Sequence, residues 1–252
     1  MQLTGNTVLI TGGGSGIGRA FAEQFHQRGN QVIIAGRRKS TLEAVAKANP
    51  GMDFVVLDVQ NPADIQKVAA EVIRKYPALN VLFNNAGIMQ PDNAAGAIDE
   101  ELLVATVATN LLAPVRLTAA FIEHFKQQPS ATILNNTSGL AYTPLALTAV
   151  YSATKAALHS YTLSLRFKLR NTSVKVQEIA PPWVATDLMN SSNEEGAMPL
   201  DVFIRETFQA LATDAPEILV DRVKPLRNNA GPQEHDFVTQ FNQMLEEQFA
   251  SR

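Results

Sequence analysis

Tyr151 and Lys155 have the residue types and the spacing that acid–base chemistry needs. They stand four residues apart in YSATKAALHS, a stretch with helical spacing, so their side chains lie one above the other. A free tyrosine has a pKa near 10, and bringing that value to about 7 takes roughly 4 kcal/mol of differential stabilisation. An ammonium in a cleft shielded from water is a source of that stabilisation. The pair predicts a phenol that gives and takes a proton, although such a pair occurs by chance in roughly one of every two or three chains this long.

Short apolar runs alternate with helical patterns, and these elements must position the pair. The runs expected to be strands are apolar on both sides, as in a buried parallel sheet: 7–11, 31–36, 53–59, 80–87, 131–138 and 173–180, with EILV at 217–220 as a candidate edge strand. Helices are expected at about 17–28, 40–48, 62–75, 100–127 and 152–170. This order predicts one α/β domain over 1–252, a doubly wound parallel sheet (Rossmann fold) with helices on both faces. After about 181 the rhythm breaks, and we expect a substrate loop or lid at about 187–215.

Composition excludes several classes of protein. The 252 residues are 46% hydrophobic and 18% charged with a net charge of −3, which gives no electrostatic footprint for nucleic acid or an anionic membrane. There is no cysteine, and the four histidines have no metal-ligand spacing, so no metal site is expected. No signal peptide and no apolar run of about 18 residues were recognised, and we expect a cytoplasmic protein that binds no membrane.

A glycine-rich turn, TGGGSGIG at 11–18, joins the first strand to the first helix. Its glycines allow a tight turn, a close approach to a pyrophosphate and a helix N-terminus that faces the anion. The alternative is a glycine-rich turn without a ligand. The residues expected to bind a dinucleotide here are Gly12, Ser15, Gly16, Ile17 and Gly18.

The second strand ends in AGRRK, where an acidic residue would accept from a ribose 2′-hydroxyl. This chain has Arg37 and Arg38 instead, and guanidinium groups suit a 2′-phosphate, so NADP(H) is favoured over NAD(H). The alternative is a solvated arginine pair. Asp58, followed by Val59, is expected at the adenine, although Asp58 could equally cap the helix that begins near Asn61.

The fourth strand ends in NNAG, and Ser138 closes the fifth at the same edge, thirteen residues before Tyr151. Together TG-x-x-x-G-I-G, NNAG, the serine and Y-x-x-x-K resemble the short-chain dehydrogenase/reductase family. Stretches such as TSGLA, APPWVATDL and DRVKPLR look like a subgroup encoded with the lipoteichoic acid D-alanylation genes of Gram-positive bacteria.

The resemblance implies an NAD(P)-dependent oxidoreductase acting on a small-molecule carbonyl or alcohol substrate. It assigns catalysis to four residues: Asn110, Ser138, Tyr151 and Lys155. Tyr151 would exchange the proton, Ser138 would hold the substrate oxygen, and Lys155 would bond the nicotinamide ribose. It implies further cofactor contacts from Asn85, Ala86, Gly87, Tyr151, Pro181, Val184 and Thr186. The alternative is a redox sensor or regulatory protein that holds the dinucleotide without turnover.

Asn110 has an argument of its own. Pro114 has no N–H to give to the Asn110 carbonyl, so a helix kinked there would leave an oxygen free to hold a proton-relaying water. The alternative is a bend made only for packing.

Two further expectations concern surfaces. Residues expected in a substrate wall are Met89, Leu140, Tyr142, Leu145, Trp183 and Met189, while His159 is read as structural. The helical segments at 100–127 and 152–170 are apolar around much of their circumference, which predicts a homodimer or homotetramer. The stripes expected to pair are Leu158, Tyr161, Leu165 and Leu169 on one helix and Phe121 and Phe125 on the other.

Overall fold

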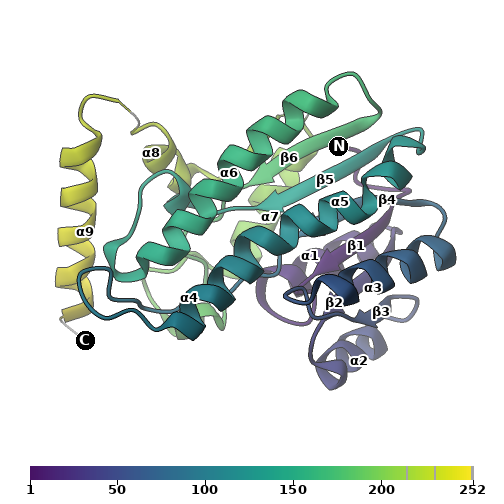
Figure 1. Ribbon diagram of the computed structural model, residues 1–252, viewed down its shortest axis with the longest axis horizontal. Helices are drawn as coiled ribbons and strands as arrows, with labels where there is room; N and C mark the ends of the chain where they lie inside the picture. The colour runs from purple at the N-terminus through teal and green to yellow at the C-terminus, as the bar shows by residue number, and fades with distance from the viewer. Residues whose placement is uncertain (214, 230, 251–252) are drawn as a thin grey trace.

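A seven-stranded parallel sheet runs through the molecule with helices on both faces (Figure 1), in the order β3-β2-β1-β4-β5-β6-β7. The computed structural model describes residues 1–213, 215–229 and 231–250, apart from the side chains of 190, 193, 249 and 250. The strands are β1 (Thr7–Thr11), β2 (Gln31–Gly36), β3 (Asp53–Val56), β4 (Leu79–Asn84), β5 (Ala131–Asn136), β6 (Val174–Ile179) and β7 (Glu217–Ile218). The predicted doubly wound fold is confirmed.

The longer helices follow the strands. They are α1 (Gly16–Gln27), α2 (Lys39–Ala48), α3 (Pro62–Lys75), α4 (Glu100–Val107), α5 (Ala113–Lys126), α6 (Ala149–Leu169), α7 (Leu200–Leu211) and α9 (Glu234–Ala250). Shorter helical turns are η1 (Ala108–Leu112), η2 (Gly139–Ala141), η3 (Ala146–Thr148), η4 (Leu188–Asn193), η5 (Asp221–Val223) and α8 (Lys224–Arg227).

Alternate residues of each strand feed two cores. Val8 and Ile10 face a core shared with α1, α2 and α7, whereas Leu9 faces one shared with α3, α5 and α6. All three side chains are fully buried, which is why the strands are apolar on both sides. The sheet order reverses between β1 and β4, and the carboxyl ends of these strands mark the crevice where open α/β sheets bind ligands.

The expected loop after residue 181 contains regular structure. Its later part is α7, where Phe203 and Phe208 are buried and the Phe208 ring lies 5.1 Å from the ring of Phe21 on α1, centre to centre. This part therefore belongs to the core rather than to a mobile loop. A lid, if the protein uses one, is confined to the residues before Leu200.

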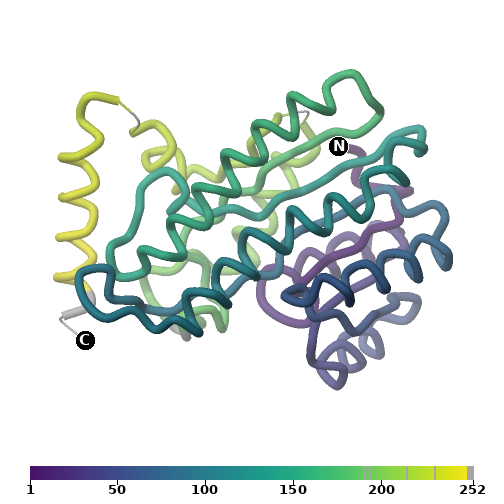
Figure 2. The backbone as a smooth tube through the Cα atoms, viewed as in Figure 1, coloured from purple at the N-terminus to yellow at the C-terminus, as the bar shows by residue number. Residues whose placement is uncertain are grey.

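The C-terminal helix α9 was missed in the sequence. It lies at one end of the molecule, away from the sheet and beside the loop that precedes α6 (Figure 2). There Asn242 Nδ2 donates to the carbonyl of Pro144 at 3.0 Å.

The helix expected at 100–127 is continuous from Glu100 to Lys126, but its middle turn is η1, a π-helix. By length and composition it is apolar enough to cross a membrane, contrary to our expectation that no such segment exists. In the fold it packs against α3, β4, β5 and α6, and a core helix gives the same signal.

Candidate active site

The turn between β1 and α1 has the backbone that only glycine adopts readily. Gly12 has φ +68° and Gly16 has φ +51°. A Cβ on Gly18 would lie 2.4 Å from the Gly12 carbonyl oxygen, so this position has no room for a side chain. Ser15 precedes α1 and makes no side-chain cap, and the first turn holds no acidic residue. The first N–H groups of α1 thus face a space that suits an anion.

Thr11 joins the ends of β1 and β4. Its hydroxyl accepts from the backbone N–H groups of Asn85 at 3.0 Å and Ala86 at 3.1 Å. The Asn85 side chain donates to the Thr11 carbonyl at 2.9 Å. The Asn85 side chain therefore links the ends of β1 and β4. Sequence reasoning missed Thr11, although its place directly before the first glycine is a signal.

A cavity of about 190 Å³ opens over this turn and collects many of the predicted cofactor residues. Those that line it are Gly12, Ser15, Arg37, Arg38, Asp58, Val59, Ala86 and Gly87. Thr41, Gln60 and Thr109 also line it and were not predicted. Gly16, Ile17 and Gly18 lie beneath it in the first turns of α1.

Asp58 does not cap the following helix. The cap is Asn61, whose side chain accepts from the backbone N–H groups of Ala63 and Asp64. Asp58 instead accepts from the Gln60 N–H at 3.0 Å and faces the cavity.

Ser138, Tyr151 and Lys155 come together at the carboxyl end of β5. All three side chains are buried, and Lys155 Nζ lies 5.5 Å from the centre of the Tyr151 ring. The Lys155 ammonium donates to the carbonyl of Asn136 at 2.7 Å, while Ser138 is hydrogen-bonded to the Tyr151 phenol. The structure thus brings together the pair that the spacing predicted. Asn136 was not predicted, although it is the last residue of β5 and stands two positions before Ser138.

The electrostatics of the pair differ from the expectation. Burial raises the pKa of Tyr151 to about 12, and the hydrogen bond with Ser138 opposes this only in part. Burial lowers the pKa of Lys155 to about 8, opposed by the charge of Glu178. Desolvation is the largest influence on both groups, and the protein alone does not make Tyr151 more acidic.

Asn110 is fully buried in η1. Its Oδ1 accepts from the Ile88 N–H at 2.9 Å, and its Nδ2 donates to the Ile88 carbonyl at 2.8 Å and to Thr154 Oγ1 at 3.3 Å. The backbone N–H of Ala113 bonds to the carbonyl of Ala108, five residues back, so the helix widens before Pro114. The interruption expected at the proline is a π-turn, and Asn110 in this turn links the segment after β4 to α6.

The segment after β6 contacts the elements on either side of the site. The Pro181 carbonyl accepts from Gly139 at 2.8 Å, and Val184 bridges to Met198. Thr186 lies 3.6 Å from the position that a Gly16 Cβ would take. Residues 181–186 therefore meet both the glycine turn and the segment that follows Ser138.

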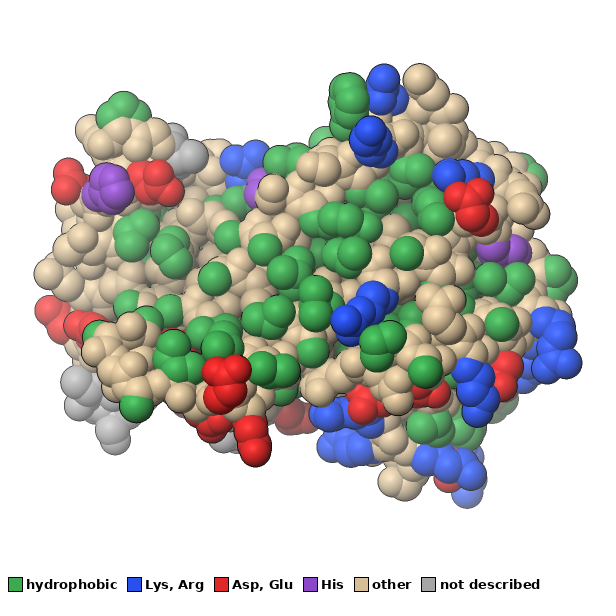
Figure 3. Space-filling model, viewed as in Figure 1, with side chains coloured by type: hydrophobic (Ala, Val, Ile, Leu, Met, Phe, Trp, Pro, Cys, Tyr) green, Lys and Arg blue, Asp and Glu red, His purple; other side chains and the backbone are tan. Residues whose placement is uncertain are grey.

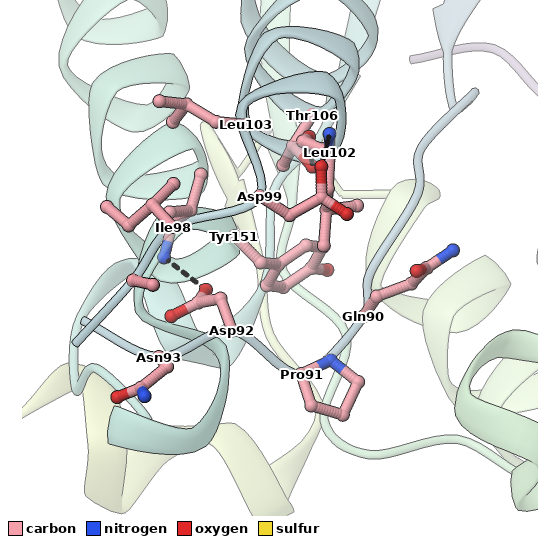
Figure 4. Close-up of a pocket in the computed structure, with 12 residues that line it drawn as sticks. Gln90, Pro91, Asp92, Asn93, Ile98, Asp99, Leu102, Leu103, Thr106 and Tyr151 are labelled. Carbon is pink, nitrogen blue, oxygen red and sulfur yellow. Dashed lines mark hydrogen bonds between the residues drawn. The ribbon is translucent and has the colours of Figure 1, made fainter. Parts of the chain in front are cut away.

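Tyr151 also lines a second cavity of about 370 Å³. In Figure 4 its ring lies between the segment after β4 and the start of α4, with Gln90, Pro91 and Asp99 around it. None of the six residues predicted to form a substrate wall lines this cavity, and their role stays a prediction. Tyr142, for example, donates to Glu178. The lining of this cavity comes mostly from residues 90–106, which were not predicted, although a chain that leaves β4 at the carboxyl edge of the sheet must cross that edge.

Known proteins agree with this geometry. A family model described as short chain dehydrogenase matches residues 6–197. The chain belongs to the short-chain dehydrogenase/reductase family. A relative, the uncharacterized oxidoreductase DltE of Bacillus subtilis (strain 168), is 41% identical over 236 residues, which cover 90% of this chain and 93% of the relative.

Two solved structures share the fold of this family member. A short chain dehydrogenase from Burkholderia cenocepacia J2315 in complex with NADP has a TM-score of 0.84 at 23% identity, covering 95% of this chain and 98% of the other. One from Burkholderia phymatum in complex with NAD has a TM-score of 0.81 at 23% identity, covering 90% and 93%. As a short-chain dehydrogenase/reductase, the protein is an NAD(P)-dependent dehydrogenase or reductase.

The residues of this chain fit such a cofactor. The glycine turn leaves the room and the free N–H groups that a pyrophosphate needs. Asn136 Oδ1 is buried near Lys155 without a hydrogen-bond partner in the described part of the chain, which leaves an acceptor for a polar group of a ligand.

Proposed function

We propose that the protein is an NADP(H)-dependent oxidoreductase that transfers a hydride between the nicotinamide and a carbonyl or secondary alcohol, with Tyr151 as general acid and base. The observation that carries this proposal is the buried group of Ser138, Tyr151 and Lys155 at the wall of a cavity, next to a dinucleotide cradle. When bound, the cofactor supplies or accepts the hydride.

The roles of the residues follow from their protonation. In reduction, Tyr151 gives its proton to the carbonyl oxygen, and Ser138 donates a hydrogen bond to that oxygen as negative charge develops. In oxidation Tyr151 takes the proton back. Its pKa of about 12 means that the phenolate needs more positive charge than Lys155 provides, and the positively charged oxidised nicotinamide supplies it.

Lys155 can donate hydrogen bonds both to the protein backbone and to the cofactor. It holds the Asn136 carbonyl now and can turn one of its three donors to a nicotinamide ribose. Asn110, with Thr154, fixes the helix that carries this lysine, and its backbone carbonyl would hold the relaying water. Pro181, Val184 and Thr186 orient the nicotinamide ring.

The preference for NADP(H) rests on charge at the adenosine end. Arg37 and Arg38 are exposed, line the smaller cavity and form no ion pair within the described part of the chain. Their guanidinium groups are free to bind a 2′-phosphate in a planar fork.

The protein is further proposed to act in the cytoplasm as a homodimer or homotetramer, with residues 187–199 as a substrate loop. Of the residues predicted to pair, Leu158, Leu169, Phe121 and Phe125 are buried within the subunit, whereas Tyr161 and Leu165 are partly exposed. The exposed apolar side chains on these helices are Val104, Leu112, Leu163 and Phe167.

One experiment tests the function. NADPH oxidation is followed with a panel of ketones, aldehydes and quinones, and Tyr151→Phe is the matched variant that lacks only the hydroxyl. We expect at least about 100-fold loss of kcat in the variant with little change in cofactor binding. Binding of NADPH with no turnover of any carbonyl compound would favour the sensor, and full activity in the variant would exclude Tyr151 as the acid.

A further inference from the structure

A second polar cluster lies directly behind the proposed acid–base pair. At its centre is Glu178 on β6, whose side chain is completely buried. Its carboxylate accepts from Thr137 Oγ1 at 2.6 Å, from the Tyr142 hydroxyl at 3.2 Å and from His159 Nδ1 at 2.8 Å. Because an ionised carboxylate can only accept, Nδ1 of His159 carries a proton in this arrangement. Both oxygens of the buried Glu178 carboxylate therefore have hydrogen-bond donors, as a buried polar group requires.

The cluster is joined to the reacting groups at two places. Thr137 stands between Asn136, whose carbonyl holds the Lys155 ammonium, and Ser138, which is bonded to the Tyr151 phenol. His159 is one turn beyond Lys155 on α6, on the same face. One carboxylate therefore fastens both the strand end and the helix that carry the site.

Two other charged groups around Glu178 are paired with each other. On β7, Glu217 is held by two hydrogen bonds from Arg227 of α8, at 2.8 and 3.2 Å. The Arg227 guanidinium also lies over the Tyr142 ring, at 5.0 Å. Burial and the charges of both carboxylates raise the pKa of Tyr142, so it remains a neutral donor. Two cations beside the cluster, Lys155 and Arg166 of α6, have no carboxylate in contact within the described part of the chain, and Arg166 donates to the carbonyls of Val176 and Pro216 instead.

The same cluster is less suited to binding a metal ion. His159, Glu178 and Glu217 bring ligand atoms within 4.8 Å of one another. However, Arg227 occupies both oxygens of Glu217, and Glu178 is engaged by three donors. A metal ion would have to displace an arginine and leave buried donors without acceptors.

We propose that Glu178, held by His159, is a positioning residue for the reaction, which keeps Lys155 in its ammonium form and holds the ends of β5 and α6 in register. This inference rests on the proposed function, because it assigns a purpose to the charge of Lys155. Burial pulls the pKa of Lys155 down to about 8, and the charge of Glu178 is what opposes it. Without that charge, Lys155 would lose its proton at a lower pH, and a smaller fraction of it would be the ammonium at neutral pH.

The test measures the protonation of Lys155 directly and needs no turnover. In protein labelled with ¹³C-lysine, the Cε resonance of Lys155 is identified by its loss in Lys155→Arg and is followed from pH 5 to 11. Glu178→Gln keeps the size and one acceptor oxygen but removes the charge. We expect the Lys155 midpoint to fall by about one pH unit. The matched control is Glu217→Gln, which removes a carboxylate that Arg227 already neutralises. In this variant the Lys155 midpoint should equal that of the wild type.

The alkaline limb of kcat/KM for carbonyl reduction should move with the same midpoint. His159→Asn, which keeps a neutral donor near the Nδ1 position, should preserve the wild-type limb. A purely structural role for Glu178 would lower the rate at every pH without moving the limb, and that result overturns the proposal.

A readout on the wild-type protein covers the case in which Glu178→Gln does not fold. With ¹³C-glutamate labelling, the Glu178 carboxyl carbon should show a step at the pH where Lys155 titrates. No step at that pH, or an equal shift of the Lys155 midpoint in Glu217→Gln, also overturns the proposal. Failure of the Tyr151→Phe test alone would leave these titrations intact, so the two hypotheses can fail separately.

Discussion

At the scale of single residues, Tyr151 and Lys155 share deep burial, and burial acts on them in opposite senses. It raises the pKa of the phenol to about 12 and lowers that of the ammonium to about 8. Both shifts disfavour the charged form. In the protein alone, therefore, the tyrosine is a proton donor at every physiological pH, and the lysine is the group that titrates.

This predicts the pH dependence of carbonyl reduction. As the pH rises through about 8, Lys155 loses its proton and with it the positive charge at the ribose, so kcat/KM should fall there. Tyr151 does not limit the reaction in this range, because its pKa of about 12 keeps it protonated. A pH–rate profile from 6 to 10.5 at saturating NADPH checks this. An activity that stays constant to pH 10 would contradict the assigned role of Lys155.

A second prediction concerns the two arginines at the cofactor cavity. Arg37→Ala and Arg38→Ala should each weaken NADPH binding by roughly 10-fold, since a charge-assisted hydrogen bond contributes about 1.5–3 kcal/mol. NADH binding should change little, because NADH has no 2′-phosphate. Fluorescence titration of both cofactors measures this, with Arg74→Ala on the exposed side of α3 as the control. Equal losses for NADPH and NADH would refute the preference.

At the scale of elements, α7 is part of the core and not of the predicted lid. Phe208 is 2% exposed, with ring centres 5.1 Å from Phe21 and 5.0 Å from Phe25. Phe208→Ala should lower the free energy of unfolding by about 3–5 kcal/mol, because it removes a ring from a closed aromatic cluster. Leu188→Ala, at a position that is 40% exposed, should cost little. Denaturant unfolding measures both variants. A small loss of unfolding free energy in Phe208→Ala would contradict the assignment of α7 to the core.

Much of this organisation could be predicted from the sequence. Buried strands such as TVLIT can be recognised because they are apolar on both faces. Glycines such as Gly12 can be recognised because the turn requires a backbone conformation that other residues rarely adopt. Position 110 could be singled out because Pro114 lacks a donor. Contacts between distant segments could not be predicted, since they depend on how loops fold back. The cavity wall at 90–106 and the Glu178 cluster are of this kind.

At the scale of the whole molecule, one face carries exposed apolar side chains. Figure 3 shows hydrophobic side chains gathered over α5 and α6, with acidic side chains towards the edges of the view. Leu163 and Phe167 on α6 are 44% and 62% exposed. Two copies that pair across these helices would cover this surface.

This predicts the effect of charge on assembly. Leu163→Glu combined with Phe167→Glu should convert the dimer or tetramer to smaller species, because the pairing would bury two carboxylates without partners. Met244→Glu is the control, since Met244 is equally exposed, at 56%, but lies on α9. Light scattering at micromolar concentration gives the masses. A wild-type monomer, or a double variant with the wild-type mass, would exclude this interface.

The wide turn at 108–112 also constrains how this chain can evolve. The Ala113-to-Ala108 bond holds one residue more than a regular turn contains. Deleting a single residue there would restore regular helix but leave α4 and α5 in nearly the same rotational register, because the wide turn fits one extra residue into about the rotation of a regular turn. The wall formed by α4 would keep its orientation, whereas the Asn110 amide, which reaches Ile88 from within the wide turn, would be displaced. A change of length at this point would therefore remove the Asn110 contacts while the rest of the helix stayed in place.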